Sequence, residues 1–312
     1  SLSYVGSKNG GYQKISSNQY SYVGEKSGEY DTISFLPLPS ITQLVGGQFA
    51  TKLIDSSLTI TTEYTRSIFE ANRFIPELIS QGNSYIVGLD YDNITNRGDV
   101  SIVISARERF QDSLFKSLDR TRSTESLRTY GVEDTVLYSQ ILLSKERERS
   151  VNLNLHFNNV SISGGYGSYT NYSTLYKGEN ITTSIAVSQD SAFIPTINAS
   201  YSRIPTTLHN GSESSLWDIL SASISKRFGT SLSITPFIGY NNTKKESLIG
   251  NTLASGSFIL RNFNGGFLFA DTRSISGKLE ARFYSDDSLR STVYSKISDN
   301  YQYQLQLGGA LS

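Results

Sequence analysis

The sequence predicts an all-β protein, a transmembrane antiparallel β-barrel of about 14 strands, within a range of about 12 to 16. Three observations predict this fold. Segments of about nine to eleven residues alternate between apolar and polar side chains through the second half of the chain. Tight turns alternate with long polar loops between these segments. No apolar run approaches the roughly 20 residues that a membrane-spanning helix needs.

Three of these segments define the two faces of the predicted barrel wall. In residues 151–158, 275–283 and 301–309, apolar side chains alternate with polar ones, so each strand has one apolar and one polar face. A Lys or Arg that faces lipid costs about 2 to 4 kcal/mol at the bilayer midplane, and it costs little in a water-filled interior. The polar side chains are therefore predicted to line the lumen: Asn152, Asn154, His156, Lys278, Glu280, Arg282, Gln302, Gln304 and Gln306.

The clearest predicted hairpin lies in residues 215–242. In its first arm, Leu220, Ala222 and Ile224 share one face. In its second arm, the apolar face carries every second residue from Leu232 to Tyr240, and "RFGT" forms the tight turn. A second tight turn is predicted at "SDN" after Ile297, and long loops are predicted after Tyr240 and Arg203.

The chain begins with a duplicated phrase. "SYVGSKNGGYQKIS" at Ser3 and "SYVGEKSGEYDTIS" at Ser21 share the pattern S-Y-V-G-x-K-x-G-x-Y-x-x-I-S. Tyr and Val favour strands and the paired glycines favour a reversal, so each copy is predicted to be a hairpin. Residues 1–40 are therefore expected to form a duplicated hairpin unit that acts as a plug or docking segment. Residues 41–133 form either early barrel strands or a small accessory domain, and residues 134–312 carry the barrel strands.

Composition excludes several classes of function. The chain has no Cys, so it has neither disulfides nor a thiolate metal site. Lys plus Arg equal Asp plus Glu at 28 each, so no net field attracts nucleic acid, and no nucleic-acid partner is expected. No spacing for a metal, a dinucleotide or a phosphate is present, and no cofactor is expected. Of the two histidines, His156 and His209, the first has Ser and Asn neighbours, but a lumen-facing role is favoured over catalysis. No catalytic residue is assigned, and the chain is expected not to be an enzyme.

The alternating pattern of residues 134–312 resembles the outer-membrane β-barrels of Gram-negative bacteria. This resemblance implies an outer-membrane location, contact with outer-membrane lipid, and a porin-like role as a channel or transport pore. The alternative role is the membrane anchor of a surface assembly, with partners from a surface or secretion assembly. "YVGEKSGEY", "NRGDV" and "RTYGVEDT" are also similar to segments of large surface barrels of the Bacteroidota type. One departure is the end "LGGALS", which lacks the terminal aromatic residue common in such barrels. Together with a start at Ser and the absence of Met, it predicts a chain that is mature, trimmed or a segment of something longer.

The competing interpretation is a soluble extracellular β-rich adhesin or structural surface protein, either a solenoid or a tandem sandwich. The two interpretations differ in the apolar face. A barrel turns that face outward, whereas a sandwich buries it between two sheets.

Overall fold

The computed structural model describes residues 2–17, 19–32, 39–73, 79–94, 100–117, 127–132, 144–188, 194–208, 211–229, 232–250, 252–271, 275–290 and 293–309. His209 and residues 133–143, where the barrel strands were predicted to begin, lie outside this set. The N-terminal strands are β1 (Ser3–Tyr4), β2 (Tyr12–Ser16), β3 (Gln19–Tyr22) and β4 (Tyr30–Asp31). They are followed by β5 (Ile41–Leu53), β6 (Leu58–Glu70), β7 (Ile79–Ile94), β8 (Val100–Gln111), β9 (Glu146–Phe157), β10 (Val160–Asn171), β11 (Tyr176–Val187), β12 (Thr196–Leu208), β13 (Glu213–Ser225), β14 (Leu232–Ile249), β15 (Thr252–Leu253), β16 (Phe258–Asp271), β17 (Ile275–Arg290) and β18 (Val293–Gly309).

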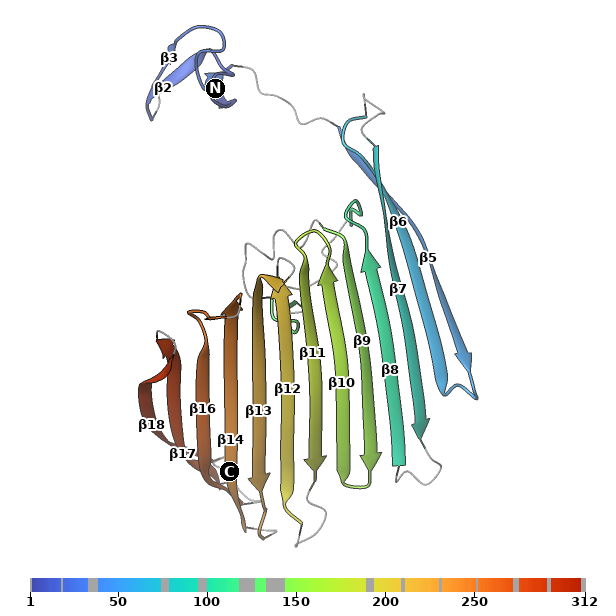
Figure 1. Cartoon of the computed structure of the whole chain (residues 1–312), viewed down its shortest axis with the longest axis vertical. Helices are drawn as coiled ribbons and strands as arrows, with labels where there is room; N and C mark the ends of the chain where they lie inside the picture. Colours follow the sequence, from blue (N-terminus) through green and yellow to red (C-terminus); the bar gives the residue numbers. More distant parts are fainter. Residues whose placement is uncertain are drawn as a thin grey trace. The chain divides into compact units, whose positions relative to one another are not determined.

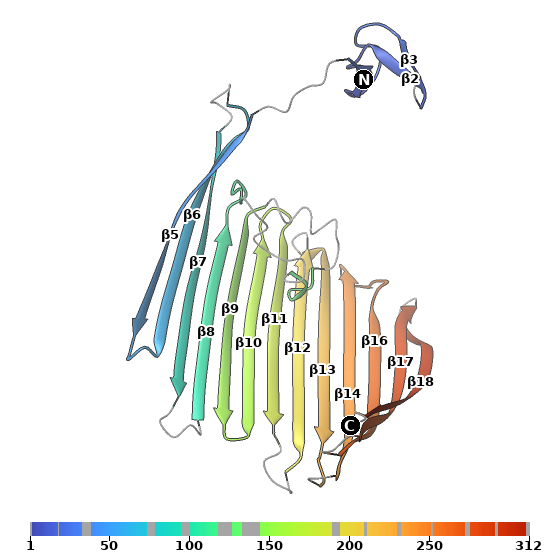
Figure 2. The same cartoon turned by 180° about the vertical axis from the view of Figure 1, so that it is seen from behind.

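The predicted fold class is confirmed. The main sheet has 14 antiparallel strands, and its strands follow one another in chain order from β5 to β18, with the two-residue β15 beside β14. Figures 1 and 2 show these strands side by side in that order. Within the described residues, β5 and β18 are the two ends of the series, each with one neighbour. Closure of the sheet into a barrel therefore stays a prediction.

The registers confirm the hairpin predicted in residues 215–242. β13 and β14 pair so that Ala222 lies opposite Tyr240 and Ile224 lies opposite Ile238. Directly opposed residues of antiparallel strands point to the same side of the sheet, so the two predicted apolar faces combine into one. Alternation along each arm thus predicted the side, and the tight turn between the arms predicted the pairing partner.

Parts of two predicted loops, and one predicted turn, are instead strand. The polar residues after Tyr240 continue β14 as far as Ile249, and those after Arg203 continue β12 as far as Leu208. "SDN" lies inside β18, and its Asp299 pairs with Ser285. The prediction failed here because polar composition was interpreted as loop, whereas backbone pairing to a neighbouring strand holds a polar segment extended.

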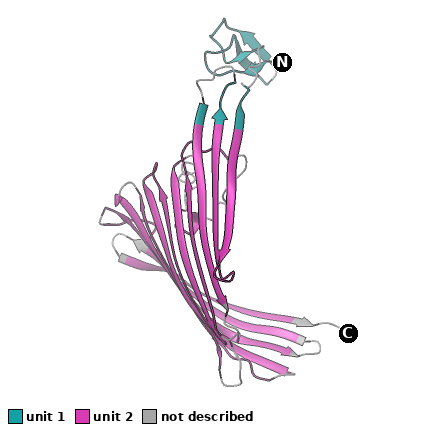
Figure 3. Cartoon of the chain, turned by 90° about the vertical axis from the view of Figure 1, so that its right-hand side faces the viewer, with its two compact units in different colours: residues 1–42, 69–80 teal, residues 43–68, 81–312 magenta. Residues whose placement is uncertain are grey.

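The described chain divides into two compact units, shown in Figure 3: residues 1–42 with 69–80, and residues 43–68 with 81–312. The first contains a four-stranded sheet in the order β1-β4-β2-β3. Its pairings correct the predicted hairpins, because β1 of the first copy pairs with β4 of the second, and β2 pairs with β3. The strands of one copy thus pair with strands of the other copy. Gly6 and Gly24 turn the chain with φ of 96° and 107°.

Residues 41–133, expected to be either early barrel strands or an accessory domain, contribute β5 to β8 to the main sheet. Among the described residues, no helix has the length and apolar character needed to span a membrane.

Candidate pore-lining face

All nine residues predicted to line the lumen lie on one face of the main sheet. Starting from Asn152, directly opposed residues connect β9 to β17 without a change of side. The series is Asn152, Gly165, Thr182, Ser202, Ile219, Thr243, Leu260 and Asp286. Across β17 and β18, Lys278, Glu280 and Arg282 oppose Gln306, Gln304 and Gln302 in turn. We call the side that carries these residues the polar face.

The opposite side, which we call the apolar face, is largely uncovered. Ile238 is 61% exposed, Leu279 is 50% exposed and Tyr303 is 81% exposed. Other exposed side chains on this face are Val151, Leu153, Phe157, Ile162, Tyr166, Ile181, Ile185, Leu220, Ile224, Ile234, Phe263, Phe267, Tyr301, Leu305 and Leu307. Soluble proteins seldom expose a continuous apolar patch of more than a few hundred Å². This face therefore requires an apolar environment around it.

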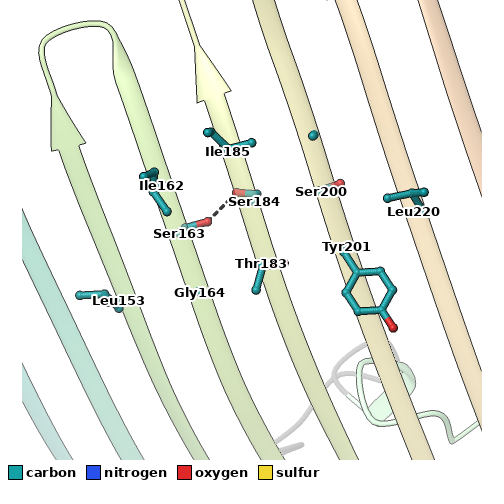
Figure 4. Close-up of a pocket in the computed structure, with 11 residues that line it drawn as sticks. Leu153, Ile162, Ser163, Gly164, Thr183, Ser184, Ile185, Ser200, Tyr201 and Leu220 are labelled. Atoms are coloured by element: carbon teal, nitrogen blue, oxygen red, sulfur yellow. Dashed lines mark hydrogen bonds between the residues drawn. The ribbon is translucent and has the colours of Figure 1, made fainter.

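Figure 4 shows a hollow of about 450 Å³ in this region, across β9 to β13. Leu153, Ile162 and Ile185 contribute branched aliphatic side chains to it, and Gly164 leaves open space between them. On the other side of the same strands, the hydroxyls of Ser163 and Ser184 are hydrogen-bonded at 2.6 Å. The sheet is thus a single layer with apolar chemistry on one side and polar chemistry on the other.

The polar face is most highly charged around Glu280, which is 1% exposed. Its carboxylate accepts hydrogen bonds from the Lys278 Nζ at 2.6 Å, the Arg282 Nε at 2.8 Å and the Asn264 Nδ2 at 3.1 Å. A buried carboxylate needs such partners, because an unpaired charge is costly to desolvate. The two cations are about a third exposed, so one net positive charge is presented to the space above this part of the face.

The other predicted residues form a hydrogen-bonding surface. The His156 Nδ1 is 2.8 Å from the Ser161 Oγ, and the Asn152 Nδ2 donates to the Ser105 Oγ at 3.4 Å. Asn152 also lines a polar hollow of about 470 Å³ with Glu63, Asp90 and Arg107. Both signs of charge and neutral amides therefore occur along the same surface. Among the described residues there is no group of three or more His, Asp or Glu side chains arranged to hold a metal ion.

Sequence reasoning missed the segment of residues 127–132, which packs on the polar face. Leu127, Tyr130 and Val132 form the main buried cluster together with Tyr169 of β10 and Tyr176 of β11. The Tyr130 hydroxyl donates to the Glu148 Oε1 at 3.0 Å, and the Tyr176 hydroxyl donates to the Tyr130 carbonyl oxygen at 2.7 Å. This segment therefore lies directly on the polar face.

Glycines on the strands make room for Tyr130. A Cβ atom at Gly178 would lie 2.3 Å from the Tyr130 carbonyl oxygen, and one at Gly167 would lie 3.0 Å from the Tyr130 ring. Glycine inside a strand commonly marks a place where another backbone approaches closely. The glycines at 167 and 178 were therefore the signal in the sequence that could have predicted this contact.

One end of the apolar face carries charged and aromatic side chains instead of aliphatic ones. Glu108 of β8 forms ion pairs with Arg147 and Arg149 of β9, the second at 3.0 Å. The Tyr85 hydroxyl donates to Glu108 at 2.9 Å, and the Lys145 Nζ lies 5.2 Å from the centre of the Tyr172 ring. The aliphatic surface therefore ends at a border of charges and aromatic rings, as at a membrane–water interface.

Comparison with known proteins gives a likeness of fold. No family model matches the chain, and no curated protein matches it. Among solved structures, it is similar to OmpT, an outer membrane protein of Vibrio cholerae, in a trimer form, with 8% identity and a TM-score of 0.36 over 86% of this chain and 98% of that one. A second structure of the same protein gives 8% identity and a TM-score of 0.35 over 86% and 95%. The outer membrane is the location predicted from the sequence.

The expectation that the chain is not an enzyme is corrected at this point. Both matched structures carry the name OmpT, and nothing in that likeness supports the exclusion of catalysis. Catalysis is therefore not excluded for this chain.

Proposed function

We propose that this chain forms the wall of an outer-membrane β-barrel whose polar face lines a water-filled channel. The proposal rests on one observation: the two faces of a single-layer sheet carry different kinds of side chain, polar on one and apolar on the other. The nine predicted polar residues share one face, and the opposite face exposes aliphatic and aromatic side chains from Val151 to Leu307. Lipid tails would cover the second face, and water would fill the space beside the first.

The charges support a channel of weak selectivity. Glu280 is paired with Lys278 and Arg282, while Asp90, Glu63 and Arg107 share one hollow. Because both signs alternate along the surface, small polar solutes of either charge would pass. The segment of residues 127–132 would narrow the passage, since it stands on the polar face and is held by Glu148 and Tyr176.

The test is permeation through the assembled protein extracted from outer membranes and reconstituted into liposomes. We expect uncharged sugars to enter the liposomes up to a sharp size limit. In Gly178→Val, which displaces Tyr130, we expect this size limit to be larger. Absence of permeation in both proteins would contradict a channel and favour the second candidate, a membrane anchor. That candidate rests on residues 1–42 and 69–80, which form a compact unit and could hold a binding surface for a partner.

A further inference from the structure

The two edge strands of the main sheet, β5 and β18, run in directions that determine which strands could pair with them. Among the described residues, consecutive strands from β5 to β18 are antiparallel neighbours, and with the short β15 left aside this series contains thirteen of the 14 strands. The direction of the chain reverses at each step, so an odd number of strands brings the last one back to the direction of the first. β5 and β18 therefore run the same way.

Direct closure would then place β5 and β18 in a parallel pair. Bacterial single-chain barrels have an even number of strands, all antiparallel, and parallel pairing is slightly less stable per residue. In a bilayer an open edge leaves a row of backbone N–H and C=O groups without partners, which costs several kcal/mol for each group. Both edges therefore need a partner that runs in the opposite direction.

A second copy of this chain cannot supply that direction. All copies enter a membrane in the same orientation, so β5 and β18 of every copy point the same way. Every edge-to-edge pairing between copies would again be parallel. This step rests on the proposed location in a membrane, whereas the count of strands does not. The described strands of the N-terminal unit are not suitable either, since they are two to five residues long.

We propose that the edges at β5 and β18 bind an odd number of β-strands from a segment outside residues 1–312. The segment runs antiparallel to both edges and alternates apolar with polar residues. β18 fixes this alternation, because Tyr301, Tyr303, Leu305 and Leu307 lie on the apolar face and Gln302, Gln304 and Gln306 lie on the polar one. A neighbour in register must match both faces.

The test is residue-level hydrogen exchange on the 312-residue chain refolded in lipid bilayers. We expect alternate amides of β5 and β18 to exchange on the order of a hundredfold faster than amides of β10, which has strand neighbours on both sides. A synthetic peptide with the sequence of Ile275–Arg290, which already pairs antiparallel with β18 on its other side, serves as the probe. Its addition should slow the unprotected β18 amides by on the order of tenfold or more. A peptide of the same composition without the alternation should not.

Each remaining outcome overturns the proposal. Protected edge amides in a monomeric chain without peptide would mean direct closure of β5 on β18. Protected edge amides in a dimer would mean pairing between copies. Open edges that the alternating peptide leaves unprotected would mean that the edges do not accept a strand. None of these outcomes decides whether the polar face is wet, which is tested separately by labelling of β18, so the two proposals fail independently.

Discussion

Gly10 and Gly28, equivalent positions in the two copies of the N-terminal repeat, pair with one another. The Gly10 amide donates to the Gly28 carbonyl oxygen at 3.1 Å, and the Gly28 amide donates to the Gly10 carbonyl oxygen at 2.8 Å. On either side, Tyr4 stacks edge-on against Tyr30 at 5.4 Å, and Tyr22 stacks against Tyr12 at 5.2 Å. The two copies are thus related by an approximate two-fold rotation. Each copy is therefore the pairing partner of the other.

This symmetry predicts equal damage from equivalent substitutions. In Gly10→Ala the new Cβ would lie 2.3 Å from the Tyr30 carbonyl oxygen, and in Gly28→Ala it would lie 2.3 Å from that of Tyr12. We expect each variant to destabilise the small sheet by about 2 kcal/mol or more, because backbone atoms must move apart. Exchange of the Val5 and Val23 amides, which are bonded at 2.8 Å to the other copy, measures the effect. Ser7→Ala, in an exposed turn, is the control, and unequal effects of the two glycine variants would contradict the symmetry.

The contact at Gly178 predicts a release of the segment of residues 127–132. Gly178→Val places a branched side chain where the Tyr130 carbonyl oxygen lies, so the segment must leave the polar face. We expect trypsin to cleave after the exposed Arg128 on the order of tenfold faster. Gly164→Val is the matched control, because a Cβ at Gly164 meets no atom closer than 3.9 Å. Equal cleavage of both variants would show that Tyr130 is not held by this contact.

The pairing around Glu280 predicts a change in ion selectivity. Glu280→Gln removes one negative charge and leaves Lys278 and Arg282 facing the lumen, so the local charge rises from +1 to +2. We expect the reversal potential of the reconstituted protein to shift toward anions. Because both cations are a third exposed and can rehydrate, we expect a loss of about 1 to 2 kcal/mol of stability. Gln304→Ala, opposite Glu280 and exposed, should change neither property. An unchanged reversal potential in Glu280→Gln would show that this cluster does not line the lumen.

The two faces of β18 predict opposite effects of one substitution at neighbouring positions. Leu305→Arg places a charge on the apolar face and should cost about 2 to 4 kcal/mol near the bilayer midplane. Gln304→Arg places the same charge on the polar face and should be tolerated. The fraction of protein assembled in the outer membrane measures the difference. Equal assembly of the two variants would mean that the apolar face does not contact lipid.

Much of the main sheet could be predicted from the sequence, because alternation along a strand specifies which side chains share a face and a tight turn specifies the neighbouring strand. The polar residues of β9, β17 and β18 were assigned to one side from period alone, and the registers place all nine on the same face. The extensions of β12 and β14 could not be predicted. Their residues resemble a loop in composition, and it is the neighbouring strand that makes them extended.

Two further features depend on contacts between distant segments. The contact of Tyr130 with Gly178 joins a connecting segment to a strand, and no local pattern specifies it. The pairing of Gly10 with Gly28 was hidden for another reason. A repeat of strand, turn and strand is compatible with a hairpin inside each copy and also with pairing between the copies. The close backbone contact between Gly10 and Gly28 favours pairing between the copies.

The central claim, that the polar face is wet and the apolar face is in lipid, is tested most directly by cysteine labelling of β18. The chain has no native Cys, so Gln304→Cys and Leu305→Cys each carry a single thiol. In the protein assembled in the outer membrane, a water-soluble maleimide should label position 304 and leave position 305 unlabelled. A fluorophore attached at 305 should be quenched by lipid-confined spin probes, and one at 304 should not. The reverse pattern, or equal labelling of both thiols by the water-soluble reagent, would contradict the account.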